Sequence, residues 1–387
     1  MRKRIVALSA TLVLLGAGAT SVAPVTAAAN FQLQEAIAFT STRDCPSCAT
    51  PAELFSAAEL YLGTPDFSDA NPANWRVTNL RRLTANTDAD GFAALSPDGK
   101  KIVFDSNRNR REGEPLNTSD LFVMDTHGDE QTFLTRGSTA AWSPDSKWIA
   151  FHASASGTGA PLRTDPGSAT SDSDIFIANV DELLAGVAAP TNITRGWTES
   201  NGQRIKIADD PDWSPDGQHI VFTAHDAGDD PPSPPFISNS AEIYVLDAPF
   251  TGTPRRLTYT SVPDDGIADE EERAPDWSPD GERIEFMCRI GGGTADFELC
   301  VMNADGSNRV QLTNNTVPDL SANWSPDPDG KQLVFHRPVA GLFQLFLINS
   351  TLDSDGARPT ERRVTSAPGL NGFPDWGFVR TKAEAGA

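Results

Sequence analysis

Three of the five histidines stand at or just beyond the ends of short apolar segments that contain phenylalanine. His152 and His336 directly follow such a phenylalanine, and His225 lies three residues after one. Because alternate residues of a strand share a side, the three side chains are expected to leave their strands in the same sense. Together with Asp105 or Asp226, His152 and His225 would supply nitrogen and oxygen ligands for a divalent metal. The alternative is that these positions are exposed strand ends that accept any polar residue.

Acidic residues cluster in the same part of the sequence. Asp209 and Asp210 form one cluster, and the ranges 226–230 and 264–272 contain two more. Carboxylate oxygens at this density suit Ca²⁺, although none of the clusters has the spacing of an EF-hand. The alternative is that these are solvated carboxylates in surface loops. Ca²⁺ or another divalent metal is therefore the one cofactor that the sequence suggests.

A repeated phrase predicts the elements that carry these residues: Trp-Ser-Pro-Asp-Gly, followed by an apolar segment ending in Phe. Its five copies, some of them imperfect, begin at Leu95, Trp142, Trp213, Trp277 and Trp324. Pro, Asp and Gly favour a tight turn, so each copy predicts a hairpin. A segment such as Glu242–Asp247 and a pair such as Leu257-Thr258 follow each hairpin. Each unit therefore predicts four short strands, which is one propeller blade.

The two ends of the chain supply the parts of one further unit. Residues 35–39 read as a second strand that lacks a first, and residues 59–62 and 80–84 match the third and fourth. The missing first strand is Phe373–Trp376, which repeats Pro-Asp-Trp with no unit after it. The sequence therefore predicts an all-β fold: a six-bladed β-propeller of four-stranded antiparallel blades, closed by pairing of the C-terminal strand with the N-terminal blade.

Most of the length variation between units falls in connections that should emerge on one face of this propeller. These connections are residues 41–58, 106–119, 153–173, 196–208, 226–241 and 259–273. Insertions on one face of a repeat array commonly mark its binding face. The candidate residues of that face are His152, His225, His336, Asp105, Asp226, Asp209 and Asp210, and the metal candidates among them are His152, His225 and Asp226.

The N-terminal residues have the pattern of a secretory signal peptide. Arg2, Lys3 and Arg4 precede an apolar run over residues 5–17, and Ala27–Ala29 provide a small-residue cleavage site. We expect a signal peptide at 1–29, a single propeller domain at 30–380 and a disordered tail at 381–387. No later apolar run is long enough to cross a bilayer. The mature chain is expected to be a monomer without a transmembrane segment, periplasmic or secreted.

Charge and cysteine content restrict the partners and the compartment. The formal net charge is −22, which is the wrong sign for a nucleic-acid-binding protein and favours solubility outside the cell. Four cysteines suit an oxidising compartment. Cys288 and Cys300 fall in neighbouring strands of one unit, so a cross-strand disulfide is expected. Cys45 and Cys48 have the spacing of a redox motif, but they lie in a predicted loop without a helix, which favours a small structural disulfide.

The repeat resembles the PD40 (WD40-like) repeat of TolB-like six-bladed propellers. The resemblance rests on Pro-x-Trp-Ser-Pro-Asp-Gly, the Ile-x-Phe strand, the Ile-Tyr-Val-x-Asp strand and the Leu-Thr pair, and it covers most of the chain after residue 30. It implies a periplasmic or exported scaffold that binds a partner over one face or at the mouth of its axis. TolB joins an N-terminal α/β domain to its propeller and works with the lipoprotein Pal. Here only a few residues separate the predicted signal peptide from the first strand, so the resemblance to TolB applies to the propeller alone.

The same repeat family contains enzymes, whose catalytic residues would be visible as motifs in the sequence. Ser-Pro-Asp recurs in every copy of the phrase, which indicates that it forms the turn and is not a catalytic motif. No Gly-x-Ser-x-Gly motif of a serine hydrolase is present in the sequence. Prolyl peptidases carry such a propeller beside a hydrolase domain, which has no counterpart in this sequence. We therefore expect a non-catalytic scaffold for a protein or cell-envelope partner. The alternative, suggested by metal-dependent polysaccharide lyases of this type, is a carbohydrate-active enzyme that uses His152, His225 and nearby carboxylates.

Overall fold

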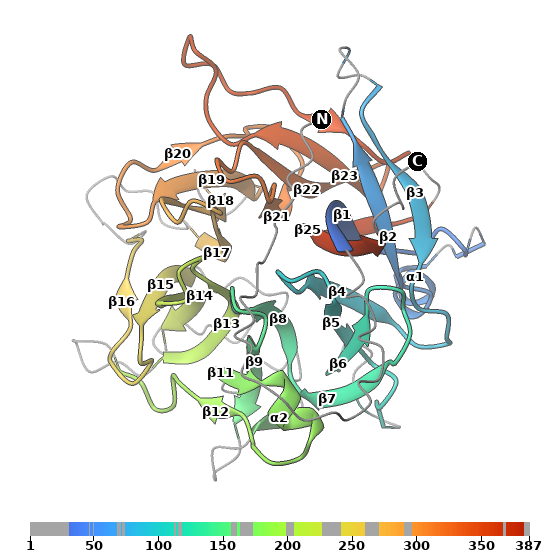
Figure 1. The fold of residues 1–387 in the computed structure, drawn as a ribbon. Helices are drawn as coiled ribbons and strands as arrows, with labels where there is room; N and C mark the ends of the chain where they lie inside the picture. Colours follow the sequence, from blue (N-terminus) through green and yellow to red (C-terminus); the bar gives the residue numbers. More distant parts are fainter. Residues whose placement is uncertain are drawn as a thin grey trace, which may run out of the picture.

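The structure is a computed structural model in which all sheets stand around one axis (Figure 1). It describes residues 31–382 apart from residues 46, 49, 68–70, 72–73, 112–113, 115–117, 156–160, 163–172, 199–204, 227–240, 260–270, 290–295 and 367–368. The predicted signal peptide and the last five residues therefore lie outside the described residues.

Four of the sheets are separate four-stranded blades with antiparallel neighbours. The first contains β25 (Asn371–Lys382), β1 (Phe31–Ser41), β2 (Glu59–Asp66) and β3 (Arg76–Arg82). The second contains β4 (Asp90–Leu95), β5 (Lys101–Ser106), β6 (Asp120–Asp125) and β7 (Thr132–Arg136). Two more contain β17 (Glu271–Trp277), β18 (Arg283–Arg289), β19 (Glu298–Asn303) and β20 (Val310–Gln311), and β21 (Leu320–Trp324), β22 (Gln332–Val339), β23 (Leu342–Asn349) and β24 (Arg362–Arg363).

The fifth sheet has nine strands, so the prediction of six separate four-stranded blades is wrong for this part of the chain. It contains β8 (Ser138–Trp142), β9 (Trp148–Ala155), β10 (Pro161–Leu162), β11 (Ser173–Asn179), β12 (Thr191–Asn192), β13 (Ile205–Trp213), β14 (His219–Asp226), β15 (Ala241–Asp247) and β16 (Arg255–Arg256). A parallel pairing of Ser173 with Ile207 joins β11 to β13. The Ser173 hydroxyl also donates to the backbone oxygen of Ala208 at 3.2 Å, which strengthens the junction.

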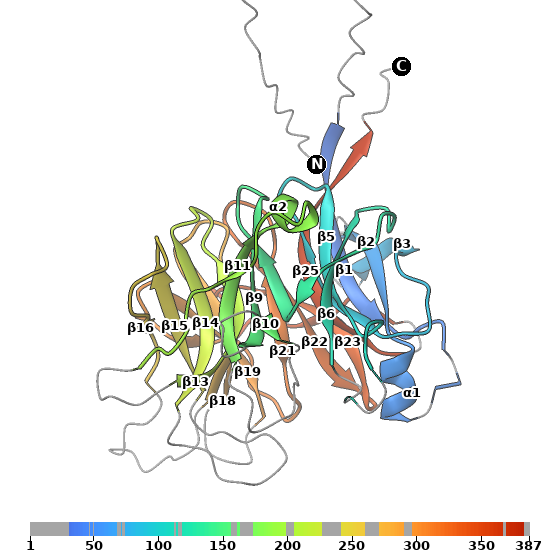
Figure 2. The same cartoon turned by 90° about the horizontal axis from the view of Figure 1, so that it is seen from below.

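The predicted pairing between the two ends of the chain is present. β25 pairs with β1 in antiparallel register, with Trp376 opposite Ile37 and Asp375 opposite Ala38. β25 continues to Lys382, so Thr381 and Lys382 belong to the strand and not to the predicted tail. The outer halves of β1 and β25 project from the disc as a two-stranded ribbon (Figure 2).

The buried apolar side chains fall into six clusters, each made by two neighbouring sets of strands. The four tryptophans of the repeated phrase and Trp376 belong to five of them, and all five are at most 8% exposed. Trp324, for example, packs with Leu299 and Val301 of the preceding sheet. A large flat side chain fills the wedge between two twisted sheets, as the sequence suggested.

The predicted turns are confirmed in detail. At Ser214, the hydroxyl donates to the Asp216 carboxylate at 2.6 Å and accepts the backbone N–H of His219 at 2.9 Å. Gly217 has a φ of +69°, a conformation that glycine adopts without strain. Ser146 takes the same place in another copy with a φ of +59°. The turn formed by the repeated phrase is therefore stabilised by side-chain hydrogen bonds as well as by the backbone preferences of its residues.

The Leu-Thr pairs also have a physical role. The hydroxyl of Thr258 accepts the backbone N–H of Ile243 at 2.9 Å, because only two residues of the fourth strand, Arg255 and Arg256, pair with β15. Four other threonines make the same 2.9 Å bond in their own units, namely Thr84, Thr194, Thr313 and Thr365. Each hydroxyl thus continues the ladder beyond the end of the fourth strand.

Two short helices interrupt the all-β pattern. α1 (Pro51–Ser56) follows the first disulfide, and α2 (Val180–Leu184) follows β11 with Asn179 as its N-cap. Figure 2 places α2 on the face from which the β1–β25 ribbon projects, here called the terminus face, and α1 on the opposite face, called the long-connection face. Among the described residues, no helix has the length and apolar composition needed to cross a bilayer.

Candidate binding site around the central axis

In each set of four strands around the axis, the innermost strand carries a β-bulge at the corresponding position. The register shifts there, and one non-glycine residue adopts a φ between +45° and +51°. These six residues, called the axial ring, are Phe92, Thr139, Asp210, Ala274, Ser321 and Phe373. A positive φ is uncommon for residues other than glycine, and such strain gathers at functional sites. Figure 1 shows the strands that carry them, β4, β8, β13, β17, β21 and β25, nearest the axis.

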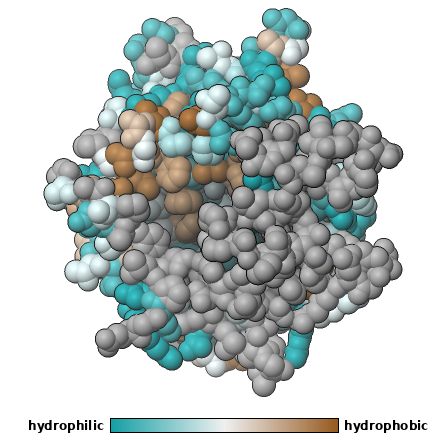
Figure 3. Space-filling model, turned by 180° about the vertical axis from the view of Figure 1, so that it is seen from behind, coloured by the Kyte–Doolittle hydropathy of each residue, from teal (hydrophilic) through white to brown (hydrophobic). Residues whose placement is uncertain are grey.

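One side of the axial ring is aromatic. The rings of Phe92 and Phe373 lie 4.3 Å apart, and Phe373 contacts the His336 ring at 4.7 Å. His336 also packs against Phe343 at 4.7 Å. Phe92 is 38% exposed, an unusual position for a large apolar side chain. Figure 3 shows the long-connection face, where apolar surface gathers over the part of the disc that holds the two chain ends.

His336 belongs to this aromatic side and not to a shared histidine site. Its Nδ1 atom accepts the backbone N–H of Phe373 at 3.2 Å, so the ring proton is on Nε2 in the neutral form. The side chain is fully buried, and burial lowers its pKa to about 3. His336 is therefore neutral at physiological pH. The predicted binding-face residue His336 is thus a buried side chain that packs against Phe373.

The opposite side of the axial ring is polar. The Thr139 hydroxyl and the His152 Nδ1 atom are 2.7 Å apart. The Asp105 carboxylate accepts the Thr139 N–H at 3.2 Å and the Ser119 hydroxyl at 3.1 Å, and it also accepts the Ser138 hydroxyl. Burial raises the pKa of Asp105 to about 7 and lowers that of His152.

Acidic and basic groups continue this polar side toward β17. Burial, and next the charge of Asp210, raise the pKa of Asp209 to about 8. Arg273 of β17 offsets part of this effect and pairs with Glu271, which also pairs with Arg289. Asp105, His152, Asp209 and Asp210, all predicted as binding-face residues, are thus electrostatically coupled around one side of the axis.

A second set of side-chain oxygen acceptors has a structural role that the sequence did not reveal. Asp212 accepts the backbone N–H of Trp277 at 2.8 Å, Asp276 accepts that of Trp324 at 3.1 Å, and Asn323 accepts that of Trp376 at 2.7 Å. Each of these bonds joins one innermost strand to the next. The recurrent Pro-Asp-Trp marks these aspartates in the sequence, but it does not indicate which strand supplies the N–H that each carboxylate accepts.

The predicted metal site at His152, His225 and Asp226 stays a prediction. The backbone of His225 lies opposite Ile207 and Ala241, whereas His152 lies opposite Ser138 and Ile175. The side chains of His225 and Asp226 lie outside what the structure describes. Within the part that is described, no group of three His, Cys, Asp or Glu side chains is arranged to hold a metal ion.

Both predicted disulfides are confirmed. Cys288 and Cys300 join β18 to β19 in the core, and Cys45 and Cys48 close a small loop. The expectation that no helix accompanies the second pair is wrong, because α1 begins at Pro51. Thr50 and Glu53 form its capping box: the Glu53 carboxylate accepts the Thr50 N–H at 2.9 Å, and the Thr50 hydroxyl accepts the Glu53 N–H at 3.3 Å.

Comparisons with known proteins agree with this architecture. No family model matches the chain. An uncharacterised protein of Agrobacterium fabrum is 24% identical over 256 residues, which are 61% of this chain and 79% of that protein. The crystal structure of TolB from Acinetobacter baumannii has a TM-score of 0.59 and 17% identity over 88% of this chain, and the match spans 66% of TolB.

Two further solved structures share the arrangement. A putative TolB from Agrobacterium tumefaciens has a TM-score of 0.50 and 16% identity, with 91% of this chain and all of that chain covered. Hydrazine synthase from Kuenenia stuttgartiensis has a TM-score of 0.54 and 12% identity, with 90% of this chain and 47% of that chain covered. At these identities the likeness concerns the fold alone. The chain has the β-propeller fold of the TolB proteins.

Proposed function

We propose that this chain is an exported, non-catalytic propeller that binds an extended segment of a partner protein at the axial ring, on the long-connection face. The observation that carries the proposal is the exposed Phe92 ring packed at a tilt against Phe373, with both residues held in left-handed bulges. Exposed aromatic side chains fixed by a rigid scaffold are typical anchors of protein interfaces, because they bury a large area with little loss of entropy.

We further propose that the nine-stranded sheet works as two blades, so that six blades form a closed ring. The strand orders β8-β9-β11-β12 and β13-β14-β15-β16 are each those of a blade, and β11 and β13 share only the pair of Ser173 with Ile207. The six apolar clusters support this view, since one of them packs Val334 and Leu345 against Ile37 and Phe39 across the chain ends.

The chemistry of the axial ring favours a particular kind of segment. Phe92 and Phe373 offer apolar surface on one side, and Asp210, whose charge acts on the neighbouring Asp209, offers a carboxylate on the other. A segment with one apolar side chain and one or more basic side chains complements both. The envelope partner that the sequence analysis expected would contact the propeller through such a segment.

Site-specific photocrosslinking tests the proposal. p-Benzoylphenylalanine in place of Phe92 should give a protein adduct in living cells, because the substitution keeps an aromatic ring at the site. The same substitution at Phe133 is the matched control, since that ring is 46% exposed on the outer strand β7. Adducts at both positions, or at neither, would contradict binding at the axial ring.

Export rests on the N-terminal sequence and on the two disulfides. Arg2, Lys3 and Arg4 followed by the apolar run have the order of a Sec-type signal, and disulfides persist outside the cytoplasm. N-terminal sequencing of the protein purified from its native host should begin at Asn30. An intact Met1 on the functional protein would contradict export by this route.

A further inference from the structure

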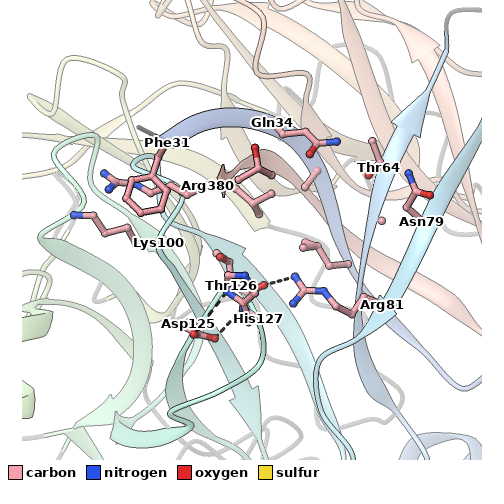
Figure 4. A pocket seen from close by; sticks show the side chains of 16 residues that line it. Phe31, Gln34, Thr64, Asn79, Arg81, Lys100, Asp125, Thr126, His127 and Arg380 are labelled. Atoms are coloured by element: carbon pink, nitrogen blue, oxygen red, sulfur yellow. Dashed lines mark hydrogen bonds and ion pairs between the residues drawn. The ribbon is translucent and has the colours of Figure 1, made fainter. Parts of the chain in front are cut away.

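A cavity of about 710 Å³ lies on the terminus face, where two strands of one sheet diverge (Figure 4). β1 and β2 pair from Ser41 opposite Glu59 as far as Ile37 opposite Gly63. Beyond that point, residues 31–36 of β1 pair only with β25, and residues 64–66 of β2 pair only with β3. Among the described residues, one edge of β1 is thus left open along the cavity.

The open edge matters because an extended strand alternates the direction of its backbone groups. Every second residue between Phe31 and Ala36 turns its N–H and C=O away from β25, toward the cavity. Such groups are a template for an added strand. Gly63 marks the divergence: a Cβ atom there would lie 2.3 Å from Val77 Cγ1 and 2.8 Å from Leu80 Cδ2, so a larger residue would require these side chains to move.

The cavity combines an apolar floor with a cationic rim. Leu62 and Val379 form part of the floor, and the Phe31 ring, 51% exposed, stands at its entrance. Three cations stand around it in Figure 4, Arg81, Lys100 and Arg380, and His127 lies beside them. Asp125 is the one acidic residue of the lining. This is a local excess of positive charge in a chain of net charge −22.

The hydrogen bonds of these cations leave room for a ligand. Arg81 donates to the Thr126 backbone oxygen at 2.5 Å. Arg380 donates from Nε to the Asp98 backbone oxygen at 2.9 Å, and its Nη2 lies 3.9 Å from the Asp98 carboxylate. Lys100 pairs with the Asp98 carboxylate at 2.8 Å and is 52% exposed. A guanidinium has five N–H donors, so Arg81 and Arg380 keep donors for a second partner.

The corresponding groove between the β13–β16 strands and the β17–β20 sheet has the opposite charge. Arg255 lies opposite Val245 in β15 as Arg81 lies opposite Leu62 in β2. That groove measures about 340 Å³, and its lining includes the carboxylates Asp216, Asp280 and Asp305. The cationic rim is therefore a property of the junction between the chain-end sheet and the β4–β7 sheet, and not of the repeat.

We propose that this cavity and the open edge of β1 bind an extended acidic peptide segment. The segment adds as a strand to residues 31–36, inserts an apolar side chain over Leu62 and Val379, and places carboxylates against Arg81 and Lys100. Main-chain pairing supplies affinity and the alternate side chains supply specificity, as in other cases of β-strand addition. The site lies on the face opposite the axial-ring segment of the proposed function and does not depend on it.

A labelled peptide tests this site directly. The probe is an acetylated, amidated heptapeptide, Glu-Val-Glu-Phe-Glu-Val-Glu, with a fluorescein label, titrated with the full chain by fluorescence anisotropy. We expect saturable binding. The variant Arg81→Glu/Lys100→Glu should lose at least about tenfold in affinity, because two attractive contacts become repulsive. The matched control is Arg255→Glu/Lys147→Glu, which changes the net charge equally at corresponding positions of other units.

Further peptides and variants decide between the alternatives. Lys100→Glu alone removes an exposed cation, so its loss of binding cannot come from unfolding, which circular dichroism checks. Equal loss in the control variant, or equal binding of a probe with Lys in place of Glu, overturns the proposal. A probe with N-methylated backbone amides should bind at least tenfold more weakly, and unchanged binding would refute strand addition. If the chain self-associates and Lys100→Glu abolishes that association, the occupant of the site is a second copy of this chain, and the peptide proposal is overturned.

Discussion

The carboxylate of Asp375 accepts the backbone N–H of Leu95 at 2.7 Å, although 280 residues separate the two in the chain. Asp375 lies in β25 and Leu95 in β4, so the bond joins the innermost strand of the chain-end sheet to that of the next sheet. Asp212, Asp276 and Asn323 make the corresponding bonds elsewhere around the axis.

Replacing Asp375 should therefore weaken the junction between the two ends of the chain. We expect Asp375→Ala to lower the free energy of unfolding by about 1–3 kcal/mol, because the Leu95 N–H loses its acceptor. Asp375→Asn keeps a side-chain oxygen and should recover most of the loss. Urea denaturation followed by tryptophan fluorescence measures both, with the exposed Asp353→Ala as control. Equal stability of the Ala and Asn variants would contradict this role.

The threonine that extends each ladder gives a second prediction. Thr258 accepts the Ile243 N–H and donates to the Glu242 carboxylate at 2.6 Å. Thr258→Val keeps the shape but removes both bonds, leaving a buried N–H and a buried carboxylate short of one partner each. We expect a loss of about 2–3 kcal/mol. Thr258→Ser retains the hydroxyl and should lose less, so a Ser variant as unstable as Val would show that the hydroxyl is unimportant.

The two disulfides should differ in accessibility and in their effect on stability. Cys288 and Cys300 are fully buried, whereas Cys45 and Cys48 are partly exposed. A mild reductant acting on the folded protein should therefore release two thiols, and four after unfolding, as counted by alkylation and mass spectrometry. Removing the Cys288–Cys300 bridge, which closes the longer loop, should destabilise the protein by about 3 kcal/mol on the chain-entropy estimate. Four thiols from the folded protein would contradict the burial.

Buried carboxylates predict that stability falls as the pH rises from 3.8 to about 8. Burial raises the pKa values of Asp105 and Asp375 to about 7 and that of Asp209 to about 8, from 3.8. Between pH 3.8 and these raised pKa values, the folded chain holds protons that the unfolded chain has released. The free energy of unfolding therefore decreases with increasing pH. His336 acts in the opposite sense only between about pH 3 and 6.5, because its pKa is lowered.

The interval from pH 6.5 to 8 therefore isolates the carboxylates. We expect the thermal midpoint to fall across this interval, and Asp105→Asn to flatten the slope because the amide does not titrate. Asp129→Asn, at an exposed position, is the control. Differential scanning calorimetry at constant ionic strength measures the midpoints. A midpoint that rises with pH, or an unchanged slope in Asp105→Asn, would contradict the assignment.

Much of the architecture could be read from the sequence, because its determinants are short runs of neighbouring residues. Ser214–His219 contain the groups that form their turn, and Thr258 follows the fourth strand that it extends. The pairing of Phe373–Trp376 with Ile37 could be inferred because one unit lacked a first strand and no other strand was available. Cys288 and Cys300 were assigned because neighbouring strands of one hairpin bring them together.

The candidate sites, in contrast, were decided by the tertiary structure. Phe92, Phe373 and His336 come from three sheets, and nothing in the local sequence states that the left-handed bulges bring their rings together. The cavity beside Gly63 exists because β1 follows β25 while β2 follows β3, a choice between two partners distant in the chain. Local residue preferences determined the turns and strands of this protein, whereas packing between sheets determined which side chains share an axis or line a cavity.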